Sequence, residues 1–226
     1  MSYLRYVKII GTMHVSPESR KKVRKTILEE KPHAIAIELD KRRFYAMQNP
    51  QRIKLGEAVK YGRKGIIQYI LTKVEEKLGE EFGMMPGGEM MEAINLAGLL
   101  GIHLYLIDED INVITAKILK APLREKLLLL LESLAVFIPL PLGREERDII
   151  TDFKVMMTQF KMKYPYLYRV LVEERNEIMA RSLIAIVNNL RARGIKKPRV
   201  VAVVGLGHKS GIERILNSHK AFISPR

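Results

Sequence analysis

The stretch that decides the fold is Val200–Leu216, which reads VVAVVGLGHKSGIERIL. An apolar run leads through Gly205–His208, in the pattern Gly-x-x-His, into the start of a helix. Near the other end of the chain, Tyr6–Val23 reads YVKIIGTMHVSPESRKKV and repeats this pattern at Gly11–His14. Glycine lets the backbone turn sharply at a strand end. The two copies therefore predict two strands that each aim a histidine into the same crevice of a sheet.

Four runs rich in apolar residues predict the strands of this sheet, and they are Tyr6–Thr12, Ala34–Leu39, His103–Ile107 and Arg199–Gly205. Nearly continuous apolar runs are typical of strands that helices cover on both faces. Helical patterns lie between the runs, in the order β-α-β-α-β-(helices)-β-α. We therefore expect an α/β fold with a mixed, partly parallel central sheet flanked by helices, in a single domain over residues 1–226.

The helical patterns have clear boundaries. Ser16 and Pro17 give one helix its cap and first position, and residues 87–101 read as a helix between glycines. From Asn112 to about Arg193 no strand pattern occurs, and prolines interrupt the helical periodicity. The sequence therefore predicts a long all-helical insertion, about 112–193, before the last strand.

The most apolar stretch of the chain is Leu127–Gly143, LLLLLESLAVFIPLPLG. It contains a glutamate and two prolines, and it is shorter than the ~20 apolar residues that a membrane span needs. It is also too apolar to be exposed to water on the surface of a soluble monomer. We expect it to be buried in the helical part or at a two-fold interface, and we favour a homodimer.

Polar side chains come after each predicted strand. In open α/β sheets, ligands bind outside the carboxyl ends of the strands. His14, Glu38 and His208 would meet at that edge, together with carboxylates after the second and third strands. Such a cluster suits a divalent metal ion or general acid–base chemistry. Because an unpaired buried carboxylate is expensive, the alternative for Glu38 is a structural salt bridge with Arg43 or Arg175.

Composition narrows the function classes. The chain has no cysteine, which excludes disulfides, zinc–thiolate sites and cysteine nucleophiles. The formal net charge is +14, but basic residues alternate with glutamates and lack interleaved aromatic rings, so we expect nucleic acid not to be a partner. The amino terminus has no signal-peptide pattern, which favours a cytoplasmic location. Abundant Lys and Glu would suit a thermophile.

The motifs together resemble the TraB family, which belongs to one α/β superfamily with Tiki proteins, erythromycin esterases and ChaN-like haem-binding proteins. The resemblance rests on five segments in order: IIGTMHVSPES, AIELDKRRFYAM, GGEMMEAINLAGLLGIHLYLIDEDINVITAKI, LVEERNEIMARSL and VVAVVGLGHKSGI. It implies a site built from six residues. They are His14, Glu38, Arg43, Glu174, Arg175 and His208.

The resemblance also implies roles for these residues. Tiki-like relatives act as metal-dependent proteases, and their metal centre maps onto His14, Glu38 and His208. TraB relatives in bacterial pheromone systems reduce the activity of a secreted peptide. The chain departs from the family pattern twice: Glu109 stands where a basic residue is usual, and Asn176 stands where an aspartate is usual.

The leading hypothesis is a metal-dependent hydrolase that acts on small peptides. His14, Glu38 and His208 would hold Mn²⁺, Co²⁺ or Zn²⁺, and the ion would activate a water molecule. Arg43 or Arg175 would stabilise the oxyanion, and Glu174 would orient an arginine or transfer a proton. Three alternatives stay open. They are a metal-independent esterase-like hydrolase, a regulator that sequesters a peptide or cofactor, and, on charge alone, a nucleic-acid binder.

Overall fold

The computed structural model describes residues 2–12, 17–48, 88–135 and 149–219. Its sheet contains β1 (Val7–Thr12), β2 (Ala34–Ile37), β3 (His103–Leu106) and β4 (Val200–Gly205), in the order β1-β4-β2-β3. All three pairings are parallel. The predicted α/β fold is confirmed, and the sheet of the described residues is parallel throughout. The two strands that carry the Gly-x-x-His patterns are neighbours, with Thr12 opposite Gly205.

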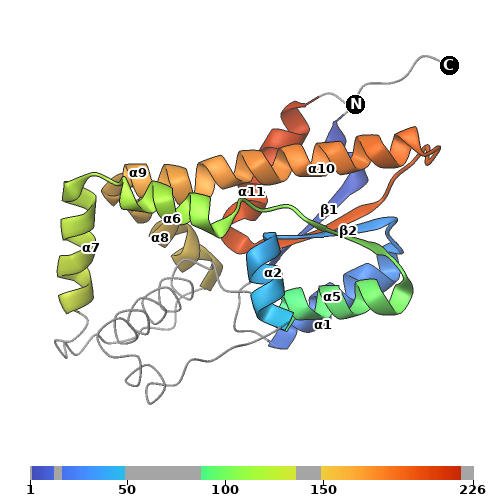
Figure 1. The fold of residues 1–226 in the computed structure, drawn as a ribbon, viewed down its shortest axis with the longest axis horizontal. Helices are drawn as coiled ribbons and strands as arrows, with labels where there is room; N and C mark the ends of the chain where they lie inside the picture. Colours follow the sequence, from blue (N-terminus) through green and yellow to red (C-terminus); the bar gives the residue numbers. More distant parts are fainter. Residues whose placement is uncertain (1, 13–16, 49–87, 136–148, 220–226) are drawn as a thin grey trace.

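Helices cover both faces of the sheet (Figure 1). On one face lie α10 (Glu174–Ala192), α11 (Leu206–Ser218) and the short η1 (Tyr3–Tyr6), which bury alternate strand residues such as Val200 and Ala202. The opposite face packs on α1 (Pro17–Glu30) and α5 (Gly88–Leu100) through the intervening residues, such as Val201 and Val203. Because β4 is buried on both faces, its run of valines, interrupted by one alanine, needs no polar alternation.

The helical insertion extends from the sheet toward the side where α7 lies (Figure 1). Within the described residues it contains only helices, and a separate apolar cluster around Ile114, Tyr164 and Leu167 holds them together. Its elements are α6 (Ile111–Leu119), α7 (Leu123–Ala135), α8 (Ile149–Lys163), α9 (Pro165–Tyr168) and η2 (Arg169–Glu173). The remaining helix, α2 (Lys41–Gln48), comes after β2 and carries Arg43.

The apolar stretch Leu127–Gly143 begins inside α7, but residues 136–143 lie outside the described part of the chain. In the described part, Leu127 is 49% exposed, whereas Leu128 and Leu129 are partly buried against the apolar cluster of the insertion. The burial of the remaining residues and their place in a dimer stay predictions. Among the described residues, no helix is both long and apolar enough to cross a membrane. The cytoplasmic location expected from the sequence also stays a prediction.

The two motif glycines do not act as left-handed turns. Gly205 has φ −60° and ψ 148°, values open to any residue, and among described glycines only Gly101 and Gly194 have positive φ. Gly11 instead permits a close approach, because a Cβ there would lie 3.1 Å from side-chain atoms of both Leu206 and Lys209. The expectation of a sharp glycine turn was therefore wrong, and Gly11 serves the packing of α11 against β1.

Candidate functional site

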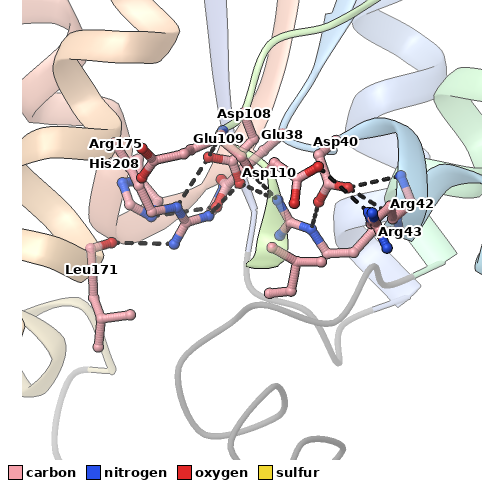
Figure 2. A network of polar contacts seen from close by, with 12 residues as sticks. Glu38, Asp40, Arg42, Arg43, Asp108, Glu109, Asp110, Leu171, Arg175 and His208 are labelled. Atoms are coloured by element: carbon pink, nitrogen blue, oxygen red, sulfur yellow. Dashed lines mark hydrogen bonds and ion pairs between the residues drawn. The ribbon is translucent and has the colours of Figure 1, made fainter. Parts of the chain in front are cut away.

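A cluster of charged side chains lies at the carboxyl end of the sheet (Figure 2). Glu38 comes directly after β2, and Asp108 comes after β3. His208 lies in the first turn of α11, which starts where β4 ends. Arg175 reaches the same point from the start of α10. Parallel pairing brings these ends together, as the sequence predicts for Glu38 and His208.

Glu38 is the centre of this cluster, with a residue exposure of only 3%. Its Oε1 accepts a hydrogen bond from Nη2 of Arg175 at 2.5 Å and lies 3.3 Å from Nε2 of His208. Its Oε2 accepts from the backbone N–H of Gly205 at 2.6 Å. The predicted salt bridge therefore exists, with Arg175 as its partner. These contacts fix both carboxylate oxygens between two strands and two helices.

Arg175 is completely buried, and the hydrogen bonds of its guanidinium to described residues go to carboxylates and one carbonyl. Besides Glu38, it donates from Nε and Nη2 to Asp108, at 3.0 and 2.6 Å, and from Nη1 to the carbonyl of Leu171 at 3.1 Å. The π-helix η2 immediately precedes this turn, and such bulges often occur at functional sites. Burial would lower the pKa of Arg175, but Asp108 and Glu38 outweigh it and raise that pKa.

Asp108 joins the two arginines of the site. Its Oδ2 accepts from Arg43 at 2.5 Å and from Arg175 at 2.6 Å. Arg43 also donates to the side chain of Asp40, which caps the start of α2 by accepting from the N–H of Arg42 at 2.7 Å. Burial by itself would raise the pKa of Asp108, but the two guanidiniums, Arg175 first, hold it well below its usual range. Asp108 is thus an anion at any ordinary pH.

We call these alternating charges the rim network, and its members are Glu38, Asp40, Arg43, Asp108 and Arg175. Glu38, Asp40, Arg43 and Arg175 are buried residues, and the side chain of Asp108 is 0% exposed. The network contains three carboxylates and two guanidiniums, so one negative charge is left over. Because buried charge is costly unless it is paired, the network favours one additional positive charge nearby. His208 lies 3.3 Å from Glu38 and would be such a charge when its ring is protonated.

His208 is held by a second contact, at the ring nitrogen that does not face Glu38. Its Nδ1 lies 2.8 Å from Oδ1 of Asn176, in α10, and its residue exposure is 6%. An amide oxygen can only accept, so this contact requires the hydrogen on Nδ1. In the neutral ring, Nε2 then carries the lone pair and directs it toward Glu38. This arrangement can hold a cation or accept a proton from a reacting molecule.

A second charged cluster lies beside the rim network on the helical insertion. Lys117 of α6 contacts Glu109 at 2.7 Å and Glu174 at 2.9 Å, and Glu174 also contacts Arg169 at 3.4 Å. We call these four residues the insertion network. Burial would lower the pKa of Lys117, but its hydrogen bonds to the two glutamates raise it.

The structure brings together most, but not all, of the predicted site. It places Glu38, Arg43, Arg175 and His208 in one cluster, whereas the carboxylate of Glu174 belongs to the insertion network. His14 lies outside the described residues. Within the described part, no group of three histidines or carboxylates is arranged to hold a metal ion. The roles assigned to these residues stay predictions, including an oxyanion contact by Arg43 or Arg175.

Sequence reasoning does not assign a role to Glu89, which the structure places at the same end of the sheet. Glu89 is 1% exposed and begins α5. Thr12, the last residue of β1, lies 3.3 Å from its Oε1 and 3.3 Å from the carbonyl of Val204. The signal available in the sequence is a glutamate after two glycines, at the start of an apolar helix. Asp108 is one of the carboxylates that the sequence places at the site, after the third strand, whereas the sequence context of Asn176 does not select it as a site residue.

Comparison with known proteins agrees with this arrangement of motifs. The model of the TraB/PrgY/gumN family matches residues 5–221. The chain belongs to this family. It is 34% identical over 225 residues to an uncharacterized protein of Methanocaldococcus jannaschii, covering 93% of this chain and 53% of that protein. It is 28% identical to a TraB domain-containing protein of Mus musculus, covering 92% of this chain and 62% of the mouse protein.

The human TraB domain-containing protein is 27% identical to the chain, with 92% of this chain and 62% of the human protein covered. The TraB-family chain therefore spans between about half and three fifths of the length of these relatives. The predicted family resemblance is confirmed. The names of these relatives state no reaction, so the chemistry of the site must be inferred from its geometry.

Proposed function

We propose that this TraB-family chain is a hydrolase that depends on a divalent metal ion and acts on small peptides. The observation that carries the proposal is the contact between Glu38 and His208 at the end of two neighbouring strands. In the Nδ1–H tautomer of His208, a carboxylate and an imidazole lone pair would face each other there, and both are acceptors. A positive charge between them would turn this unfavourable contact into a favourable one.

The distance between the two side chains suits ligands of one ion. In a tetrahedral zinc site, with bond lengths of about 2.0–2.1 Å, two ligand atoms lie about 3.3–3.4 Å apart. Nε2 of His208 and Oε1 of Glu38 are 3.3 Å apart. We propose His14 as the third ligand, because Thr12 ends the strand next to β4. Nitrogen and oxygen ligands without sulfur suit Mn²⁺, Co²⁺ or Zn²⁺.

When bound, a divalent ion supplies a water molecule whose pKa is lowered toward neutrality. The residues of the chain then provide position and charge. Arg175 holds one oxygen of Glu38, and the N–H of Gly205 holds the other. Because Arg175 is fully enclosed, we propose that it acts by fixing Glu38 and Asp108 rather than by touching a substrate. The peptide as substrate class rests on the family resemblance.

A metal-independent hydrolase is a second candidate, favoured by the same pair of side chains. Asn176 holds the proton on Nδ1 of His208, so Nε2 can accept a proton from water directly. Glu38 would then stabilise the imidazolium that forms. Both candidates need His208 and Glu38, and they differ only in whether removal of metal abolishes hydrolysis.

The test is hydrolysis of a peptide library by the full chain, with products detected by mass spectrometry. The protein is first treated with a chelator and is then given Mn²⁺, Co²⁺ or Zn²⁺. Wild type should cleave a subset of peptides only after metal is added. Glu38→Gln and His208→Ala should each lower the rate by about 10²–10⁴-fold. The double variant should lose little more, because residues that act as a unit are not additive.

His219→Ala is the matched control, because His219 is exposed at the far end of the same helix, α11. It should cleave like wild type. Undiminished hydrolysis in chelator would favour the metal-independent candidate. If no peptide, ester or amide is cleaved with any metal, but a ligand binds and is released unchanged, the hydrolase proposal is wrong and the protein is a sequestering regulator.

We also propose that nucleic acid is not a partner. A separate proposal is that the chain forms a homodimer through the helical insertion. Large apolar side chains are exposed on α6, α7 and α8, among them Leu119, Leu123 and Met162. Light scattering of wild type and Leu123→Asp tests this. A dimer in wild type and a folded monomer in the variant would support the interface, whereas a monomeric wild type would contradict it.

A further inference from the structure

One polar contact of the site, between Asn176 and His208, is made by the ring nitrogen that does not face Glu38. Asn176 lies in the first turn of α10, directly after Arg175, and it is 6% exposed. Its side chain points at His208 across the interface of α10 and α11. A buried amide is expensive unless it is hydrogen-bonded. Since an apolar side chain would fill this helix interface at lower cost, the amide needs an explanation beyond packing.

The two ring nitrogens of His208 have different neighbours. Oδ1 of Asn176 lies 2.8 Å from Nδ1 of His208, whereas Nε2 of the same ring lies 3.3 Å from Oε1 of Glu38. The imidazole thus stands between two acceptors, one on each ring nitrogen. A neutral ring has a single N–H and can satisfy only one of them. For the neutral ring, the shorter contact, to Asn176, favours the Nδ1–H tautomer, which would leave the lone pair on Nε2.

Gly211 provides independent evidence that the fold maintains this contact. It lies three residues after His208 on α11, and therefore on the same face of the helix. A Cβ at position 211 would lie 2.2 Å from Nδ2 and 2.9 Å from Cγ of Asn176. Glycine inside a helix costs about 0.5–1 kcal/mol relative to alanine. The chain accepts this cost at a position where any side chain would displace the amide from His208.

We propose that Asn176, seated against Gly211, is a positioning residue that fixes His208 as its Nδ1–H tautomer. The lone pair of Nε2 then always faces Glu38, which is the form that either a metal ion or a reacting proton requires. Histidines that bind metal ions generally donate their other N–H to such a partner, and loss of that partner typically lowers metal affinity 10–100-fold. This inference rests on the proposed function for its purpose, but the tautomer itself can be measured without metal or substrate.

The experiment is long-range ¹H–¹⁵N correlation NMR of the metal-free full chain at a pH of about 8, where an ordinary histidine is neutral. The signals of His208 are assigned with His208→Gln. Wild type should show the Nδ1–H pattern. Asn176→Leu keeps a similar volume but removes the acceptor, so His208 should change to the Nε2–H form that can donate to Glu38. Asn176→Asp restores an acceptor and should restore the Nδ1–H pattern.

Gly211→Ala tests the packing of the Asn176 amide against position 211 without altering either hydrogen-bonding group. It should reduce the Nδ1–H population, whereas Gly98→Ala should not. Gly98 lies in helix α5, and a Cβ there would meet nothing within 4 Å. The Gly98 variant thus controls for the general effect of alanine in a helix. In Co²⁺ titrations, Asn176→Leu should bind 10–100-fold more weakly than wild type.

The outcomes separate this inference from the proposed function. A wild-type Nε2–H tautomer, or an Nδ1–H tautomer that persists unchanged in Asn176→Leu, would overturn the positioning role even if peptides are hydrolysed. The predicted tautomer change in a protein that cleaves nothing would support the positioning role and contradict the hydrolase. If Asn176→Leu does not fold, the tautomer of His208 in Gly211→Ala and Asn176→Asp tests the positioning role instead. Both variants retain an acceptor at position 176.

Discussion

Two charged networks lie side by side in the structure, and consecutive residues of the chain belong to different ones. Asp108 and Arg175 belong to the rim network, whereas their sequence neighbours Glu109 and Glu174 belong to the insertion network. The ion pairs are short in both networks: Arg175 lies 2.5 Å from Glu38 and 2.6 Å from Asp108, and Lys117 lies 2.7 Å from Glu109 and 2.9 Å from Glu174. The two networks differ in exposure: the side chains of Asp108 and Arg175 are 0% exposed, whereas those of Glu109, Lys117 and Glu174 are 12%, 30% and 36% exposed.

The comparison shows that distance alone does not determine the value of an ion pair. An exposed pair gains little, because water solvates both ions nearly as well when they are apart. A buried pair costs desolvation, so removal of one partner leaves an ion that neither water nor protein stabilises. We therefore expect the rim network to be sensitive to substitution and the insertion network to be tolerant. Substitutions in the two networks test this difference, from the largest expected effect to the smallest.

Arg175→Met should have the largest effect on stability. It leaves Glu38 and Asp108 without their shared cation, and loss of one partner from a buried pair costs about 3–5 kcal/mol. Urea denaturation measures the free energy of unfolding. Arg169→Met, at a 55% exposed member of the insertion network, is the matched control. It should cost about 0–1 kcal/mol, and equal losses in the two variants would contradict the distinction.

Asp108→Asn should have an intermediate effect, about 1.5–3 kcal/mol at pH 7, because hydrogen bonds to a charged group are replaced by neutral ones. It should also change the pH dependence. The pKa of Asp108 is well below its usual range in the folded protein, whereas the unfolded value is about 3.9. The unfolded state thus binds the proton more readily, so wild-type stability is present above about pH 4 and falls as pH decreases below it.

This acid-induced loss should be smaller in Asp108→Asn, because the residue that binds the proton is absent. Urea midpoints at pH 7 and at about pH 3 measure the change. Asp110→Asn is a suitable control, since asparagine is an equally good helix cap and Asp110 is 45% exposed. A wild-type pH dependence that persists in Asp108→Asn would show that other carboxylates control acid stability.

Lys117→Met should have the smallest effect. The residue links Glu109 to Glu174 at short distances, but its side chain is 30% exposed and water can replace it. We expect the free energy of unfolding, measured by urea denaturation, to fall by about 0–1 kcal/mol. This loss should be smaller still at high salt, which screens exposed ion pairs. A loss as large as that of Arg175→Met would mean that exposure does not distinguish the two networks.

The strands and their common edge could be predicted from the sequence, because buried parallel strands have a clear apolar pattern. The runs at Ala34–Leu39 and Arg199–Gly205 lie within two residues of β2 and β4. Parallel pairing places the residues at the carboxyl end of each strand along one edge, so Glu38 and His208 could be brought together. The order of the strands could not be predicted, because it depends on which faces the helices cover.

The partners of each side chain could not be predicted in the same way. Arg43 and Arg175 were both candidates for Glu38, and only the turn of α10 after η2 selects Arg175. Glu174 and Arg175 are consecutive in sequence, but helical geometry directs them to different networks. The contact of Asn176 with His208 depends on the space that Gly211 leaves by lacking a side chain, and no local sequence pattern indicates this. Tertiary packing decides these details.

The central claim is that Glu38 and His208 act together as ligands of one divalent ion. The most direct test is a titration of the chelator-treated protein with Co²⁺, monitored by calorimetry and visible absorption. The account predicts saturation at about one ion per chain in wild type and in His219→Ala. His14→Ala, Glu38→Gln and His208→Ala should each lose the visible band and most of the affinity. Absence of saturable binding in wild type, or full binding in both Glu38→Gln and His208→Ala, would contradict the claim.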